Sequence, residues 1–245
     1  MIVEISSVAN RNHSTASVWW VNLPETAYQL ALDLQLAIVN AKIADRVFPD
    51  VIVCVEHPRV FTLGRRGGKE NLCVGEEFLS DKGVSVVSTD RGGNITYHGP
   101  GQLVAYPIID LNKRRIKVVE FVSGLEQTMI RTAAHWGIDA GTDPANRGVW
   151  LNGSKLGSIG IGVRRGISFH GLALNVNTDM KPFSWINPCG LDAVTMISIE
   201  QHLGRPVSMV EARRVMVAAF GEIFRFPAEE KSFETLNKRV RGLNP

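Results

Sequence analysis

The feature that most constrains the fold is a long stretch dense in hairpin signals. Residues 148–176 read GVWLNGSKLGSIGIGVRRGISFHGLALNV. Asn152-Gly153 is typical of a two-residue type I′ turn, and Arg165-Gly166 indicates a second reversal. Strand-like runs lie before, between and after these turns. We therefore predict three consecutive antiparallel strands here.

The flanking sequence predicts both helices and strands. In 25–47, apolar side chains recur at helical spacing, and Pro24 suits a first helical position. These apolar positions are Ala27, Leu30, Leu34, Ile38 and Ala41. Strands are predicted at 51–57, 60–65, 84–89 and 103–110, and a second helix at 118–136. Ser208 and Glu211 predict a capping box before a helix at 209–224.

These elements together predict one α+β domain over 1–245, with mixed, mostly antiparallel sheets flanked by helices. Residues 1–19 and 226–245 are expected to be peripheral. No apolar run reaches the roughly 18 residues of a membrane span, and no secretory signal is evident. A net charge of +3 is too small to indicate nucleic-acid binding. Three widely spaced cysteines fit a reducing, cytoplasmic setting better than a disulfide framework.

A glycine-rich polar segment is the first candidate for a binding site. Residues 91–102 read RGGNITYHGPGQ, with Arg91, Tyr97 and His98 among four glycines. Glycine allows the backbone to approach a ligand closely, while the polar side chains supply hydrogen-bond donors. The segment matches neither a Walker loop nor a dinucleotide fingerprint. A purely structural turn is the alternative interpretation.

A lysine and a cysteine are the candidate reactive groups. Lys155 lies among small apolar residues, so it is either a solvated edge lysine or a partly buried one with a lowered pKa and a use as a base. Cys189 lies between Pro188 and Gly190, where a thiol packs little. Cys54, inside VIVCV, is expected to be an inert core thiol, and Cys73 is ambiguous.

Two histidines in similar settings leave two interpretations open. His98 and His170 each precede glycine, as YHG and FHG. They are either ligand-contacting groups or hydrogen-bonded structural ones. No HxH or HExxH motif occurs, so no metal site is predicted.

Three long motifs, in this order, resemble the signature of lipoyl(octanoyl) transferases. They are RGGNITYHGPGQ, SKLGSIGIGVRRGISFHGLALNVNTD and INPCG, and EHPRVFTLGRR (56–66) resembles an earlier family element. The resemblance covers about 20–204. It implies the fold of lipoate-protein and biotin-protein ligase catalytic domains, with no cofactor.

The resemblance also implies an activity and its residues. Family members move an octanoyl group from octanoyl-acyl carrier protein to a lysine of lipoyl domains, namely those of 2-oxoacid dehydrogenase E2 subunits and the glycine cleavage H protein. Cys189 would carry the acyl thioester, and Lys155 would be its proton partner. The residues implied to bind substrate are Arg91, Gly92, Gly93, Asn94, Ile95, Thr96, Tyr97, His98, Ser158, Ile159, Gly160, His170, Gly171, Leu172 and Ala173.

Other functions remain open at this point. An ATP-dependent lipoate or biotin ligase on the same fold would not need a nucleophilic cysteine. An amidotransferase between lipoyl-bearing proteins and a thioesterase would share the cysteine chemistry. A non-catalytic lipoyl-domain binding module is the alternative from another class.

Overall fold

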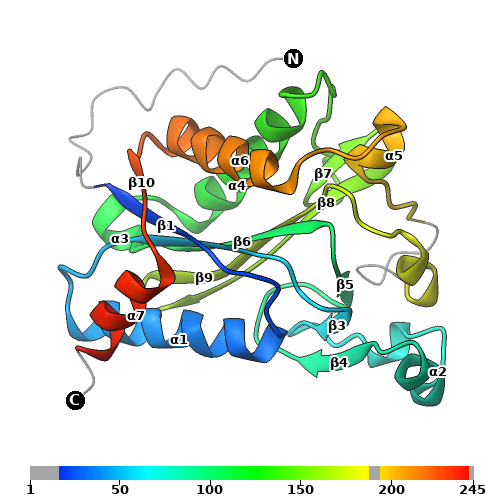
Figure 1. Cartoon of the computed structure of the whole chain (residues 1–245), viewed down its shortest axis with the longest axis horizontal. Coiled ribbons are helices and arrows are strands. Elements are labelled where there is room, and N and C mark those ends of the chain that lie inside the picture. Colours follow the sequence, from blue (N-terminus) through cyan, green and yellow to red (C-terminus); the bar gives the residue numbers. More distant parts are fainter. Residues whose placement is uncertain (1–16, 188–193, 243–245) are drawn as a thin grey trace.

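The computed structural model describes residues 17–187 and 194–242. Within these residues a seven-stranded sheet lies between helices, and a three-stranded sheet lies beside it (Figure 1). The elements are β1 (Val18–Asn22), α1 (Tyr28–Ala44), β2 (Val51–Val55), β3 (Val60–Leu63), η1 (Lys69–Asn71), α2 (Glu76–Asp81), β4 (Ser85–Ser88), β5 (Thr96–His98), β6 (Gln102–Ile108), α3 (Leu111–Arg114), α4 (Val118–Ala134), β7 (Val149–Leu151), β8 (Ser154–Arg164), β9 (Ile167–Asn175), η2 (Lys181–Trp185), α5 (Ile199–Leu203), α6 (Met209–Phe224), β10 (Ala228–Glu230) and α7 (Phe233–Arg241).

The larger sheet has the strand order β10-β1-β2-β6-β9-β8-β7. Strands β10, β1 and β2 run parallel, whereas each pair from β2 to β7 is antiparallel. The predicted run of three antiparallel strands is confirmed as β7, β8 and β9. Both of its turns place two residues at positive φ, as a type I′ turn requires: 48° and 78° at Asn152-Gly153, and 50° and 84° at Arg165-Gly166.

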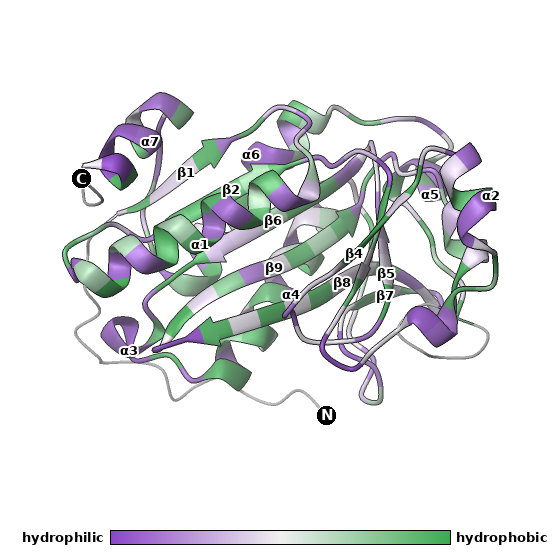
Figure 2. Ribbon diagram, turned by 90° about the horizontal axis from the view of Figure 1, so that it is seen from below, coloured by the Kyte–Doolittle hydropathy of each residue, from purple (hydrophilic) through white to green (hydrophobic). Residues whose placement is uncertain are grey.

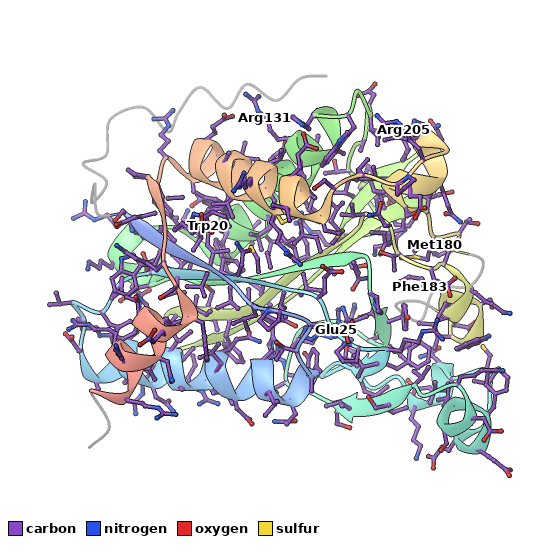
Figure 3. The ribbon with its side chains drawn as sticks, in the orientation of Figure 1. Trp20, Glu25, Arg131, Met180, Phe183 and Arg205 are labelled. Atoms are coloured by element: carbon purple, nitrogen blue, oxygen red, sulfur yellow. The ribbon has the colours of Figure 1, made fainter. Side chains whose placement is uncertain are left out.

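Helices cover both faces of this sheet, which explains the apolar character of its central strands. Alternate residues of a strand point to opposite faces. Thus Ile52 and Cys54 of β2 pack in the core under α4 and α6, while Val51, Val53 and Val55 pack in the core under α1 and α7. Trp20 lies in the first of these layers (Figure 3). Figure 2 shows α1 lying over the opposite face.

Helix α1 is confirmed, but its buried face matches the predicted apolar positions only at Ile38 and Ala41. It begins at Tyr28, four residues after Pro24, and Leu30 is 64% exposed. The buried residues include Ala31, Gln35 and Ile38. Apolar residues occur on every side of this helix, so the spacing alone did not fix which side faces the sheet.

Both ends of the chain contribute more to the sheet than expected. Val18 and Trp19, within the expected periphery, begin β1, which lies between β2 and β10. The segment 226–245 provides β10 and α7, whose Leu236 and Val240 are buried in the core. These interactions join residues over 200 positions apart, which local sequence patterns do not report.

The start of α6 forms only half of the predicted capping box. The Ser208 hydroxyl accepts the Glu211 N–H at 3.3 Å, as predicted. The Glu211 carboxylate instead pairs with His135 Nε2 at 3.0 Å. A tertiary contact has therefore replaced the reciprocal local bond.

The smaller sheet, in the order β4-β3-β5, has a core of its own. Phe61, Tyr97, Phe183 and Trp185 are buried there. Figure 3 labels Met180 and Phe183 on the segment that reaches this side of the molecule. None of the helices in 17–187 and 194–242 combines the length and apolarity that a bilayer crossing needs.

A buried ion-pair network supports the first stability prediction. The Asp50 carboxylate lies 2.7 Å from both Lys42 Nζ and Arg114 Nε, and all three side chains are at most 4% exposed. Asp50→Asn is expected to lower the free energy of unfolding by about 3–5 kcal/mol, because it leaves two buried cations without this charge. Urea unfolding measures the change. Glu234→Gln, in an exposed pair with Lys238, should cost less than about 1 kcal/mol; equal losses would contradict the prediction.

Candidate active site

A cavity of about 350 Å³ lies where β5, β6, β8 and β9 meet the glycine-rich segment. Its volume is at the lower end for small-molecule sites. Three separate parts of the sequence bring most of the predicted site residues to its wall. They are Arg91, Gly93, Asn94, Ile95, Thr96, His98, Lys155, Ser158, Ile159, Gly160, His170, Gly171, Leu172 and Ala173. That these residues bind substrate stays a prediction.

Two predicted residues do not line this cavity. Tyr97 packs against Phe61 and Phe183, with ring centroids 5.5 and 5.4 Å away, and burial raises its pKa to about 12. Strand alternation explains this, because β5 turns Thr96 and His98 to the cavity and Tyr97 to the opposite side. The Gly92 N–H bonds to Ile161 O at 3.0 Å, joining the glycine-rich segment to β8.

Cys189 lies outside the described residues, but the chain on both sides of its segment is placed. The Asn187 N–H donates to Asn71 O at 2.9 Å. After residue 193 the chain runs parallel to Lys155: the Lys155 N–H donates to Thr195 O at 2.8 Å, and the Ile197 N–H donates to Lys155 O at 3.0 Å. The chain that follows this segment is therefore hydrogen-bonded to the backbone of Lys155.

Lys155 is buried, which excludes the solvated edge position. It is 3% exposed, and its ammonium lies 5.3 Å from the centre of the Trp150 ring. The β7–β8 register shifts between Val149 and Trp150, so the ladder is irregular beside the lysine. Such irregularities re-aim side chains near functional sites.

Gly148 forms the wall beside the Lys155 side chain. A Cβ there would lie 2.8 Å from Lys155 Cε and 3.4 Å from Nζ, and its φ of +123° disfavours other residues. Its N–H donates to the buried Glu126 carboxylate at 3.0 Å. Glu126, on α4, thus fixes the turn that packs against the lysine.

Gly148→Ala is therefore expected to lower the rate of acyl transfer about 10–100-fold, since displacements of about 1 Å at a reacting group have effects of this size. Steady-state kinetics with a thioester donor measures it. Gly141→Ala is the matched control, because a Cβ there meets no atom within 4 Å. Unchanged kinetics in Gly148→Ala would show that the lysine position is not critical.

Arg91 holds the glycine-rich segment against the smaller sheet. Its guanidinium donates to Thr62 O at 2.5 Å, to Thr62 Oγ1 at 2.9 Å and to Gly92 O at 3.0 Å. On β8, a Cβ at Gly160 would lie 2.8 Å from Gly92 O. The absence of a side chain at Gly160 therefore allows the backbones of β8 and the glycine-rich segment to lie close together.

Neutral histidines form one end of the cavity region. His98 Nδ1 lies 2.7 Å from Gln102 Oε1, a carbonyl oxygen that only accepts, so Nδ1 carries the proton. Burial holds the pKa of His98 well below its usual value. Burial also lowers the pKa of His170, and the Arg91 and Arg65 charges add to this against the raising effect of Asp90. Both histidines line the cavity and are also hydrogen-bonded, so the two interpretations are not exclusive.

Several wall residues were not predicted from the sequence. His57 does not line the cavity but lies next to His98, with ring centroids 5.8 Å apart. Its ring bonds to Thr26 O and to the Tyr106 hydroxyl at 2.7 Å each, and burial lowers its pKa to about 4. The unpredicted residues that line the cavity are Tyr28, Arg66, Val104, Tyr106, Ala145, Asn146 and Arg147. Among these residues Arg66 carries a local signal, because it stands in the basic pair Arg65-Arg66.

The two remaining cysteines differ in burial. Cys54 is fully buried, which confirms its predicted core position, and burial raises its pKa to about 12. Cys73 is exposed. Within 17–187 and 194–242, no group of three or more His, Cys, Asp or Glu side chains could hold a metal ion.

Comparisons with known proteins identify the family of this chain. The family model of the lipoyl protein ligase A/B catalytic domain matches residues 27–221. A protein of Desulfotalea psychrophila named octanoyltransferase is 46% identical over 206 residues, which are 83% of this chain and 92% of the relative. An octanoyltransferase of Geobacter metallireducens is 43% identical over 191 residues, 78% of this chain and 85% of the relative.

Solved structures show the same fold at low identity. Lipoate-protein ligase A bound with ATP has a TM-score of 0.70 at 16% identity, covering 94% of each chain. A bipartite lipoate protein ligase of Thermoplasma acidophilum has a TM-score of 0.69 at 17% identity, covering 94% of this chain and 92% of that one. The predicted α+β fold of lipoate-protein ligases is thus confirmed. Taken with the sequence relatives, these findings show that the chain belongs to the lipoyl protein ligase A/B catalytic-domain family and is a transferase of the octanoyltransferase family.

Proposed function

We propose that this protein moves an octanoyl group from octanoyl-acyl carrier protein to Cys189, and then from Cys189 to a lysine of a lipoyl domain. The observation that carries the proposal is the backbone pairing of Lys155 with Thr195, which brings the chain leaving the Cys189 segment to a buried lysine at a cavity. Thr195 stands six positions after Cys189, so connectivity keeps the two within about 20 Å. The octanoyltransferase relatives supply the substrate class.

The chemistry needs a thiolate and a proton acceptor. At an ordinary pKa of about 8.5, about 3% of a thiol is ionised at pH 7, so full ionisation would add at most about 30-fold in rate. Nucleophilicity falls as the pKa falls, which removes part of that gain. Lys155 must therefore do more than stabilise a thiolate.

Proton transfer by Lys155 accounts for both half-reactions. It takes the proton of the Cys189 thiol as sulfur attacks the acyl carbonyl, and returns one to the departing carrier thiol. It then accepts a proton from the lipoyl-domain lysine as that amine displaces Cys189 and forms the amide. The first step exchanges one thioester for another, and the second is downhill, so ATP is not consumed.

The cavity suits an acyl chain. Ile95, Val104, Ile159 and Leu172 give it apolar surface. Each buried CH₂ contributes about 0.8 kcal/mol, so a hexanoyl donor should bind about 15-fold more weakly than an octanoyl one. Backbone N–H groups of the glycine-rich segments are the candidate donors to the tetrahedral oxyanion.

The proposed acceptors are the lipoyl domains of 2-oxoacid dehydrogenase E2 subunits and the glycine cleavage H protein, in the cytoplasm. The Thermoplasma acidophilum structure that shares this fold concerns a lipoate protein ligase and its E2 lipoyl domain, which supports an acceptor of this kind. An ATP-dependent ligase remains the second candidate, because lipoate-protein ligase A, on the same fold, binds ATP.

The test compares two complete mixtures. The protein and a lipoyl domain are incubated either with octanoyl-acyl carrier protein and no ATP, or with octanoic acid and ATP and no carrier. Intact mass spectrometry should show an octanoylated lipoyl domain only in the first mixture. Octanoylation only in the second would identify a ligase and overturn the transferase mechanism, and octanoic acid released without modification of the domain would identify a thioesterase.

A further inference from the structure

The charge of the cavity wall exceeds what an acyl chain requires. Among the described lining residues, four side chains are basic and none is acidic. The four are Arg66, Arg91, Arg147 and Lys155. An octanoyl group is neutral, and Lys155 has a part in the proposed reaction. The two remaining exposed cations, Arg66 and Arg147, need a separate explanation.

Arg147 is held with most of its donors open to solvent. Its Nη1 lies 3.1 Å from the Glu126 carboxylate, which is 5% exposed, whereas Arg147 is 60% exposed. The same carboxylate accepts the Gly148 N–H. Glu126 thus fixes the position of the guanidinium, which has five N–H donors. Arg147 directly precedes Gly148, the residue that packs against the Lys155 side chain.

Arg66 reaches the same cavity from another part of the chain. Its N–H donates to Gly93 O at 3.1 Å, which ties it to the glycine-rich segment, and its side chain is exposed. The ion pairs found among residues 17–187 and 194–242 do not include Arg66. Two exposed arginines on separately fixed backbones therefore line one cavity.

We infer that Arg66 and Arg147 form an anion subsite that binds the phosphodiester of the donor's phosphopantetheine arm. This inference rests on the proposed function, because carrier proteins hold acyl groups as thioesters of such an arm. Guanidinium groups match phosphate oxygens with paired, charge-assisted hydrogen bonds. The phosphate is held at the exposed guanidiniums while the flexible arm carries the thioester to Lys155. A nucleotide phosphate has the same chemistry, so the test separates the two sources.

The experiment removes the phosphate and the arginines independently. Donors are octanoyl-4′-phosphopantetheine and octanoyl-pantetheine, which differ only in the phosphate, and octanoyl-acyl carrier protein. For each donor, kcat/KM is measured for the wild type and for Arg66→Gln/Arg147→Gln. The wild type should prefer the phosphorylated small donor by at least about tenfold, and the double variant should lose that preference.

A matched variant controls for net charge. Arg164→Gln/Arg165→Gln removes two exposed arginines that do not line the cavity. It should keep the wild-type preference for the phosphorylated donor. Equal losses on both small donors in Arg66→Gln/Arg147→Gln would overturn the inference in favour of a general structural effect. A loss confined to the carrier-protein donor would assign the arginines to the protein surface of the carrier instead.

Direct binding separates this inference from the reaction itself. Calorimetry with 4′-phosphopantetheine, pantetheine and AMP needs no turnover. Tighter binding of 4′-phosphopantetheine than of pantetheine, lost in Arg66→Gln/Arg147→Gln, would support the subsite even if no donor were used. AMP binding lost in that variant, without any preference for 4′-phosphopantetheine, would make this a nucleotide site. If wild type binds both pantetheine compounds equally, the subsite does not exist.

Discussion

Replacing Cys189 with serine is expected to abolish the covalent octanoyl adduct and to lower octanoyl transfer at least about a thousandfold. A serine hydroxyl is a far weaker acid than a thiol, so Lys155 cannot generate a useful amount of the alkoxide. Intact mass spectrometry after incubation with octanoyl-acyl carrier protein detects the adduct, and peptide mapping locates it.

The other two cysteines provide the controls for this variant. Cys73 is exposed, so Cys73→Ser should keep the adduct and the wild-type stability. Cys54→Ser should also keep the adduct, but it buries a hydroxyl in an apolar core and should lower stability by about 1–3 kcal/mol. An adduct that persists in Cys189→Ser would reject Cys189 as the nucleophile.

Replacing Lys155 with arginine should have the second-largest effect, a fall in kcat of about 10²–10⁴-fold with little change in KM. Arginine keeps the positive charge but cannot release its proton at neutral pH. The larger guanidinium must also fit beside Gly148 and the Trp150 ring. Single-turnover acylation of Cys189, followed by quenched mass spectrometry, measures the chemical step directly.

Lys69→Arg is the matched substitution away from the cavity. Lys69 is 71% exposed and pairs with Glu76 at 2.8 Å, so the exchange should leave acylation unchanged. If Lys155→Arg instead kept most of the wild-type rate, the lysine would act through its charge alone. Proton transfer would then need another group.

The hairpin region shows what local chemistry can predict. Asn152-Gly153 and Arg165-Gly166 favour tight turns through their local backbone preferences. Three consecutive strands could therefore be predicted from the sequence. The same holds for the core position of Cys54 within a β-branched run. Helix α1 marks the limit: its helical spacing was correct, but its buried side depended on packing against the sheet.

For the site, the sequence predicted which residues take part, whereas their positions depend on the tertiary structure. Segments 91–98, 158–160 and 170–173 were singled out for their glycines and polar groups, and most of these residues meet at one cavity. Tyr97 was included as a polar residue of the glycine-rich segment, but it does not line the wall. Its opposite orientation is a consequence of β5 forming against β3, a pairing with no local signal.

The sequence by itself determined the turns and most strands and helices, which depend on residue type and on spacing over a few positions. Its long motifs indicated the family, and Lys155 and Cys189 stay the predicted reactive groups. Only the tertiary structure decided that Lys155 is buried beside Gly148, that Glu126 fixes this turn, and that Arg66 and Arg147 reach the same cavity. These features bring together residues from 7 positions apart (Gly148 and Lys155) to 81 positions apart (Arg66 and Arg147), and their energies arise only when separate elements pack together.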